Sequence, residues 1–281
     1  MTVVVVTDSA ASLDSATARK FGIAVVPVHV LVNGIEVGAD ADADIDYASA
    51  TVTTSAPSPG ELRTAYAAAL TSSDGDGVVA VHISRRLSAT WESARQAADE
   101  LGEQVRVVDS LAAGMGTGFA AIAAARQAAR GSSLARVAAE AERVAAQARA
   151  FIVVDRVEQL RRGGRISTAA AFFGTALVTK PVLCLADGRI ELLEKARTAS
   201  KAFAKLVAAA VDAAGVDGAA VAVQHLGAPQ PAARLATQLR AQVPDIHEVI
   251  EAEFGPVLGV HLGLGAVGVV VVPGGAGLHG E

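Results

Sequence analysis

Aromatic residues are scarce in this chain of 281 residues: they make up 4% of it, with one tryptophan and two tyrosines. Hydrophobic residues nevertheless account for 52%, so alanine, valine and leucine must fill the interior. Small side chains that fail to interlock leave space, and an apolar cavity can stay dry and take up an apolar guest. Because one domain usually spans ~100–200 residues, we expect a chain of this length to form two.

Positive charge is not in excess. The formal net charge is −5 and the pI is about 5.7, whereas proteins that bind nucleic acid usually present a basic face interleaved with aromatic residues. Neither the charge nor the few aromatic side chains provide such a surface. We therefore expect no nucleic acid among the partners of this protein.

Signals for disulfides, metal sites and membrane spans are also missing. The single cysteine, Cys184, has no second cysteine to pair with and lies in an apolar run, as a buried thiol does. The six histidines are scattered without the spacing of metal ligands. The first residues lack the features of a signal peptide, and no apolar run reaches the ~18 residues of a membrane span. We expect a soluble, cytoplasmic protein without a metal ion or a transmembrane segment.

Nucleotide and hydrolase motifs are absent or misplaced. The chain has no Gly-x-x-x-x-Gly-Lys-Ser/Thr loop and no Gly-x-Ser-x-Gly elbow. Gly263-Leu-Gly265-Ala-Val-Gly268 matches the dinucleotide fingerprint in its letters, but the apolar run 269–272 predicts a strand where the fingerprint needs a helix. Gly114-Met-Gly-Thr-Gly118 opens a predicted helix, where it allows close packing or an anion contact. We expect no cofactor.

Strands and helices alternate along the first half of the chain, which predicts a doubly wound, mostly parallel sheet. Ser58-Pro-Gly-Glu61 is a capping box with proline at the first helical position, so a helix begins there. We predict strands at 2–7, 23–32, 78–83 and 105–108, and further helices at 90–101, 116–130 and 133–149.

The second half has a different pattern. Asp187-Gly188 predicts a hairpin between two apolar runs, and alternating helices and strands follow. We therefore expect an α/β protein with an N-terminal doubly wound domain, residues 1–149, and a C-terminal α/β domain with a mixed sheet, residues 150–281.

Hydroxyl groups gather where ligands of α/β sheets bind. Thr54 and Ser55 precede the capped helix, and Ser88 and Thr90 lie at the start of another, both in loops expected at the carboxyl ends of parallel strands. An anion held away from water needs such donors. Serine and threonine are also preferred helix caps. At this point an anion site and simple capping both remain open.

Eight motifs, in order along nearly the whole chain, resemble the DegV family. The resemblance implies a two-domain bacterial protein that binds a long-chain fatty acid between its domains, and in several members presents the acyl chain to a fatty acid kinase. The motifs are Thr7-Asp8-Ser9, Thr54-Ser-Ala-Pro-Ser-Pro59, Leu87-Ser-Ala-Thr90, Asp109-Ser110, Gly163-Gly-Arg-Ile-Ser167, Lys180-Pro181, Lys195-Ala-Arg-Thr198 and His261-Leu-Gly-Leu-Gly265.

The resemblance also assigns residues. Thr54 and Ser88 match the positions that bind the carboxylate, and His261, Arg197 and Arg165 match three further motif positions. On this basis the domain of residues 1–149 would carry the carboxylate-binding loops, and residues 150–281 would cover the acyl chain. The predicted ligand-binding residues are Thr54, Ser88, Ser55, His261, Arg197 and Arg165.

Four positions depart from the family pattern. Arg85 and Ala89 replace a serine and a glycine near Ser88, and alanine resists the positive φ that glycine permits, so the loop backbone is expected to differ there. Ala56 replaces a common glutamine and Leu264 a proline. These changes bear on ligand specificity.

The predicted function is carriage of a long-chain fatty acid without chemistry, with a separate fatty acid kinase as partner. Burial of each methylene is worth ~0.8 kcal/mol, so a long chain in an apolar tunnel can bind tightly. Two alternatives remain: a serine-dependent lipid hydrolase or acyltransferase that uses Ser88 and His261, and a binding module for another apolar acid. The pairs Arg85-Arg86 and Arg161-Arg162 fit either solvated surface or transient contact with a partner or membrane surface.

Overall fold

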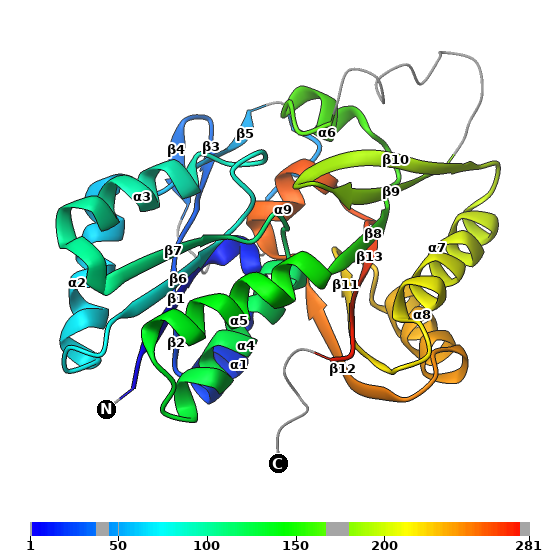
Figure 1. Cartoon of the computed structure of the whole chain (residues 1–281). Coiled ribbons are helices and arrows are strands. Elements are labelled where there is room, and N and C mark those ends of the chain that lie inside the picture. Colours follow the sequence, from blue (N-terminus) through cyan, green and yellow to red (C-terminus); the bar gives the residue numbers. More distant parts are fainter. Residues whose placement is uncertain (1, 38–44, 50, 167–179, 276–281) are drawn as a thin grey trace. The chain divides into compact units, whose positions relative to one another are not determined.

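The computed structural model describes residues 2–37, 45–49, 51–166 and 180–275 (Figure 1). The chain forms two compact units. The first comprises the described residues of Met1–His29 and Ser55–Gln147, and the second those of Val30–Thr54 and Ala148–Gly275. The protein is of the α/β class, with a parallel sheet in the first unit and a mixed sheet in the second.

The first unit is built on a four-stranded sheet in the order β2-β1-β6-β7, and all neighbouring strands are parallel. Every residue of the inner strand β6 is buried, as expected when helices cover both faces of a parallel sheet. The strands are β1 (Val4–Asp8), β2 (Ile23–Val26), β6 (Val78–His82) and β7 (Val105–Asp109). This confirms the predicted doubly wound sheet.

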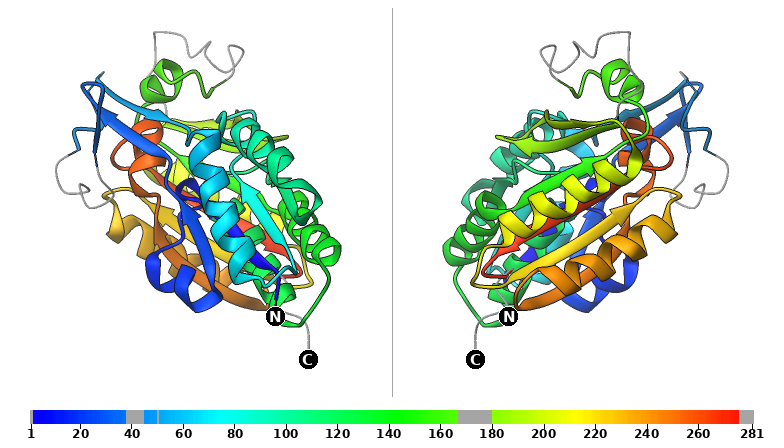
Figure 2. Two further views of the ribbon diagram at one scale, coloured as in Figure 1. Left: turned by 90° about the vertical axis from the view of Figure 1, so that its left-hand side faces the viewer. Right: turned by 90° about the vertical axis from the view of Figure 1, so that its right-hand side faces the viewer.

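Helices cover this sheet in pairs that contact one another (Figure 2). One pair is α2 (Pro59–Ser72) with α3 (Thr90–Leu101), and the other is α4 (Met115–Ala129) with α5 (Leu134–Gln147). The remaining helical elements of the unit are η1 (Ser9–Ala11), α1 (Ser15–Phe21) and η2 (Gly102–Gln104).

The glycines at the start of α4 serve close packing. A Cβ on Gly118 would lie 2.8 Å from the carbonyl oxygen of Ala11 and 2.9 Å from the sulfur of Met115. The backbone N–H of Gly114 donates to the carbonyl of Ala10, with an N···O distance of 2.8 Å. The helix therefore packs directly against η1.

The second unit is built on a six-stranded sheet in the order β10-β9-β8-β13-β11-β12. Only β11 and β12 are parallel; the other neighbours are antiparallel. Asp187 and Gly188 join β9 and β10 with φ of 47° and 76°, as in a tight hairpin turn. The strands are β8 (Arg149–Val153), β9 (Lys180–Ala186), β10 (Arg189–Ala196), β11 (Ala219–His225), β12 (Ile246–Glu253) and β13 (Val267–Pro273).

Two amphipathic helices, α7 (Ala199–Ala214) and α8 (Pro229–Gln242), pack on this sheet, and their apolar faces join one core with its valines. Two shorter helices, α6 (Glu158–Arg162) and α9 (Gly255–Leu262), contact each other. The strand β13 begins at Val267, so Gly263 and Gly265 precede a strand and Gly268 lies within it. These glycines are therefore not a dinucleotide-binding motif.

The structure divides the chain differently from the two consecutive domains, 1–149 and 150–281, that we expected. The predicted strand 23–32 is two strands, β2 and β3 (His29–Val32), interrupted around Pro27. With β4 (Ile35–Val37) and β5 (Val52–Ser55), β3 forms a small sheet in the order β4-β3-β5.

The described residues of Val30–Thr54 consequently belong to the second unit. Two contacts tie this segment to it. The ring of Tyr47 lies so close to Gly259 of α9 that a Cβ there would be 2.7 Å from Cε1. Arg162 of α6 donates to the carbonyl oxygens of Ala48 and Ser49.

None of the helices within the described part of the chain has both the length and the apolar character that crossing a membrane requires.

Ser58→Ala tests the helix start that the sequence predicted. In the structure Ser58 and Glu61 form the complete capping box: Glu61 N–H donates to Ser58 Oγ, and Ser58 N–H donates to Glu61 Oε2 at 2.8 Å. The substitution should lower the free energy of unfolding, measured in urea, by about 1 kcal/mol. Ser72→Ala, at the other end of α2, removes a hydroxyl of the same kind and should not lower it.

Candidate functional site

A cavity of about 240 Å³ lies within the second unit, between β5, α6 and α9. Its walls combine two valines with hydroxyl, amide, imidazole and guanidinium groups. The residues that line it are Val52, Thr53, Thr54, Gln159, Arg162, Gly163, Arg165, Val260 and His261.

Three of the predicted site residues meet here: Thr54, Arg165 and His261. Thr54 lies in β5 and His261 in the last turn of α9, and Thr54 Oγ1 is hydrogen-bonded to His261 Nε2 at 2.9 Å. The imidazole reaches this position because residue 163 has no side chain: a Cβ on Gly163 would lie 2.6 Å from His261 Nδ1. The Gly-Gly-Arg motif and the histidine motif, distant in sequence, therefore form one site.

His261 is a neutral group in this site. Burial, and then the positive charge of Arg165, lower the pKa of His261 from 6.5 to about 4. Burial also lowers the pKa of Arg165, although a guanidinium remains protonated at any ordinary pH. Arg165 donates a hydrogen bond to the carbonyl oxygen of Gly163. The site thus places a fixed cation beside an uncharged imidazole and a hydroxyl.

The charge of the cavity favours an anion. Of the nine lining residues, all described in the structure, Arg162 and Arg165 are basic and none is acidic. The guanidinium of Arg162 also donates to the backbone carbonyl oxygens of residues 48 and 49. It therefore links α6 to the segment that precedes β5 and Thr54. Threonine hydroxyls and arginine N–H groups are donors that suit a carboxylate.

The size of the cavity suits one end of a large ligand. Water occupies ≈ 30 Å³ per molecule in the liquid, so about 240 Å³ holds about eight groups of that size. This is enough for a carboxylate and a few methylenes. A long acyl chain would have to extend beyond it.

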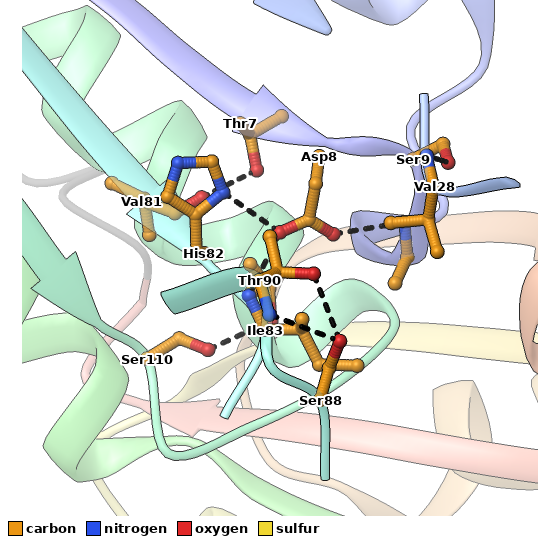
Figure 3. A network of polar contacts seen from close by, with 12 residues as sticks. Thr7, Asp8, Ser9, Val28, Val81, His82, Ile83, Ser88, Thr90 and Ser110 are labelled. Atoms are coloured by element: carbon orange, nitrogen blue, oxygen red, sulfur yellow. Dashed lines mark hydrogen bonds and ion pairs between the residues drawn. The ribbon is translucent and has the colours of Figure 1, made fainter. Parts of the chain in front are cut away.

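Ser88 belongs to the first unit, where a buried polar network supports its loop (Figure 3). The carboxylate of Asp8 lies at the centre. Its Oδ1 accepts from Ala10 N–H at 3.0 Å, and its Oδ2 accepts from Ile83 N–H at 3.0 Å and lies 2.9 Å from His82 Nδ1. The strand β6 ends at His82, so Ile83 is the first residue of the loop that carries Ser88, and Asp8 anchors the base of this loop.

Tyr66 extends this network on the far side of the His82 ring. Burial and the nearby charge of Asp8 raise the pKa of Tyr66 far above its usual value, so its hydroxyl stays protonated. This hydroxyl forms a hydrogen bond of 2.7 Å with His82 Nε2. His82 Nδ1 faces the carboxylate of Asp8, which is an acceptor, and donates to it.

The Ser88 hydroxyl has local partners. Ser88 Oγ lies 2.8 Å from Thr90 Oγ1, and it accepts from Thr90 N–H at 3.3 Å where α3 begins. Ala89 has φ of −75°, which any residue adopts, so alanine in place of glycine causes no strain here. Of the other departures from the family pattern, Arg85 and Leu264 are exposed, Leu264 by 58%.

The structure does not bring the other two predicted residues to this cavity. Ser55 is exposed at the end of β5, and its hydroxyl lies 3.4 Å from the carbonyl oxygen of Ala56. Arg197 is exposed between β10 and α7. Ser167, the last residue of the Gly-Gly-Arg motif, lies outside the described residues.

Gln159 and Arg162 line the cavity but were missed in the sequence. Both lie on α6, a helix of five residues, which is too short to give a helical period. The available signal was Gly163-Gly164, since glycine commonly follows the end of a helix.

Comparison with known proteins identifies the family. The family model described as "Uncharacterised protein, DegV family" matches residues 2–274. The chain belongs to the DegV family. It is 44% identical over 273 residues to a DegV domain-containing protein of Mycobacterium tuberculosis. The alignment covers 96% of this chain and 97% of the relative.

Solved structures of DegV proteins have the same fold. One is a DegV family protein from Thermus thermophilus, whose structure is described as showing fatty acid binding. It is 33% identical to this chain with a TM-score of 0.90, and the match covers 97% of this chain and all of the Thermus chain. DegV from Bacillus subtilis, described as a fatty acid binding protein, is 32% identical with a TM-score of 0.82, covering 96% and 99%.

The pKa of His261 predicts a pH dependence of stability. Between about 6.5 and about 4 the unfolded chain takes up a proton on His261 that the folded protein excludes. The free energy of unfolding should therefore be fully retained above pH 6.5 and fall, by at most about 3 kcal/mol, as the pH drops towards 4.

The measurement is urea denaturation from pH 7.5 to 4 on the unchanged protein and on His261→Gln. Other titrating groups are common to both, so the stability advantage of the unchanged protein should shrink as the pH falls. Parallel curves for the two proteins would show that His261 titrates in the folded state as it does in the unfolded chain.

Proposed function

We propose that this DegV protein binds a long-chain fatty acid, with the carboxylate at the Thr54–His261 pair. The observation that carries the proposal is the cavity itself, which joins a hydroxyl, a neutral imidazole and two guanidinium groups without an acidic residue among its described lining. The fatty acid binding of the Thermus thermophilus and Bacillus subtilis relatives supports it.

One of the two directions of the hydrogen bond between Thr54 and His261 suits a carboxylate ligand. A hydroxyl has one proton to donate. If the neutral His261 donates from Nε2, Thr54 Oγ1 accepts that bond and its own proton is left for the ligand. The low pKa of His261 leaves the ring uncharged with a single N–H, and the arrangement requires that this hydrogen lies on Nε2 rather than on Nδ1.

The remaining predicted contacts belong to the same proposal. Ser88 would donate a second hydrogen bond to the ligand, and the acyl chain would be buried among alanine and valine side chains. Each buried methylene contributes ~0.8 kcal/mol, so most of the affinity would come from the chain and the choice of acid from the head.

Carriage explains the chemistry better than hydrolysis does. A general base works best with a pKa near the pH at which it acts, whereas that of His261 is lowered to about 4. The hydroxyl of Ser88 is hydrogen-bonded to Thr90 in the first unit. The imidazole of His261 is hydrogen-bonded to Thr54 in the second unit. We therefore propose a carrier that presents its ligand to a separate fatty acid kinase, which would supply the nucleotide site that the sequence of this chain lacks.

Thr54→Val and Thr54→Ser test the carboxylate contact. Valine keeps the branched shape but removes the hydroxyl, so the Kd for hexadecanoate should rise about 10- to 100-fold, the worth of a hydrogen bond to a charged group. Serine keeps the hydroxyl and should bind hexadecanoate nearly as well as the unchanged protein. Isothermal titration on delipidated protein measures both.

A ligand census complements the titration. Mass spectrometry of small molecules released from purified, denatured protein should find a fatty acid in near-stoichiometric amount. If none is released and delipidated protein binds no hexadecanoate, the proposed function is wrong. Release of an acylated product or turnover of a lipid ester would favour the hydrolase instead.

A further inference from the structure

The helices α6 and α9 each place a polar side chain over the glycine that follows the other helix. His261 of α9 lies over Gly163, which follows α6, and Gln159 of α6 lies over Gly263, which follows α9. A Cβ on Gly163 would be 2.6 Å from His261 Nδ1, and one on Gly263 would be 2.6 Å from Gln159 Nε2. Each glycine thus makes room for the polar side chain of the other helix.

This arrangement brings Gln159 into the same site as His261. Both residues line the cavity, together with Thr54 and the two arginines. Gly263 has φ of 78°, a conformation that favours glycine, so the space beside Gln159 is maintained by the backbone as well as by the missing side chain. The amide therefore lies beside the turn that follows α9.

An amide differs from the other polar groups of the cavity. It has two N–H donors and one acceptor, and carries no charge at any pH. The charge of an arginine attracts anions of any shape over several ångströms. The N–H of an amide interacts favourably only with a group that places an acceptor at hydrogen-bond distance. The amide therefore suits selection among head groups more than attraction of charge.

We propose that Gln159 is a specificity-determining residue of the head-group site, where its N–H donates to the ligand carboxylate and favours a free acid over an alcohol of the same chain length. The inference rests on the proposed function and names a contact that it does not require. An alcohol presents one oxygen, which Thr54 alone can hold, whereas a carboxylate has a second oxygen for Gln159.

Two variants of Gln159 separate its donor from its shape. Gln159→Met keeps the length of the side chain and removes both N–H groups, so the Kd for tetradecanoate should rise about tenfold, while that for tetradecan-1-ol stays the same. Gln159→Glu keeps the size and adds a negative charge beside the bound carboxylate. Its Kd for tetradecanoate at pH 8 should rise more than tenfold, again with little change for the alcohol.

The pH profile gives a readout that a purely structural role would not move. Two carboxylates that share a site take up a proton on binding, so tetradecanoate should bind Gln159→Glu up to about tenfold more tightly for each unit that the pH falls from 8 to 6. The unchanged protein should show a flat profile in this range. Glu158→Gln, an exposed change on the same helix, controls for the general effect of charge and should leave the ratio of the two affinities unaltered.

Titration calorimetry with both ligands, delivered from cyclodextrin, measures these affinities. Retained binding of tetradecan-1-ol shows that the variants keep a folded cavity. Equal affinities for tetradecanoate in all variants, or equal losses for acid and alcohol, would overturn the role of Gln159 while leaving the fatty acid function intact. If the unchanged protein binds no fatty acid, the proposed function fails with it.

Discussion

The close approach of His261 to Gly163 is the constraint on which the site depends. Any side chain at position 163 would displace the imidazole, since even a Cβ would lie 2.6 Å from Nδ1, and the 2.9 Å hydrogen bond to Thr54 would be lost. Burial, and then the charge of Arg165 in the same turn, lower the pKa of His261. One missing side chain thus determines where the ring lies and which partner it has.

A neutral histidine beside fixed cations has an energetic logic. Burial of a charge is costly unless it is paired, and a protonated His261 would add a third cation to a cavity that already contains Arg162 and Arg165. A neutral ring avoids that cost without a ligand, while the guanidinium groups still attract an anion. The hydroxyl and the amide then provide hydrogen bonds that depend on distance and direction rather than on charge alone.

Much of the fold could be predicted from local sequence signals. The helix α3 begins and ends at the predicted residues, and the capping box at Ser58 and the Asp187-Gly188 turn mark boundaries by their own chemistry. Three of the motif residues, Thr54, Arg165 and His261, were predicted and meet in one cavity. The contacts that could not be predicted join residues far apart in the sequence. Thr54 and His261 are 207 positions apart. They meet because the described residues of 30–54 join the second unit, with contacts made by Tyr47 and Arg162.

The choice between capping and ligand binding, which the sequence left open for the hydroxyl groups, is not exclusive at Ser88. Ser88 precedes the N-cap residue Ala89, and its Oγ accepts from Thr90 N–H, so it satisfies one of the free N–H groups at the start of α3. Acceptance of that bond leaves the hydroxyl proton free to donate, either to Thr90 Oγ1 at 2.8 Å or to an incoming carboxylate. Thr54 follows the same logic when the imidazole of His261 donates from Nε2 in place of a backbone N–H. In both cases the protein fixes the oxygen by a donor of its own, and the direction of the remaining proton is what an anionic ligand would select.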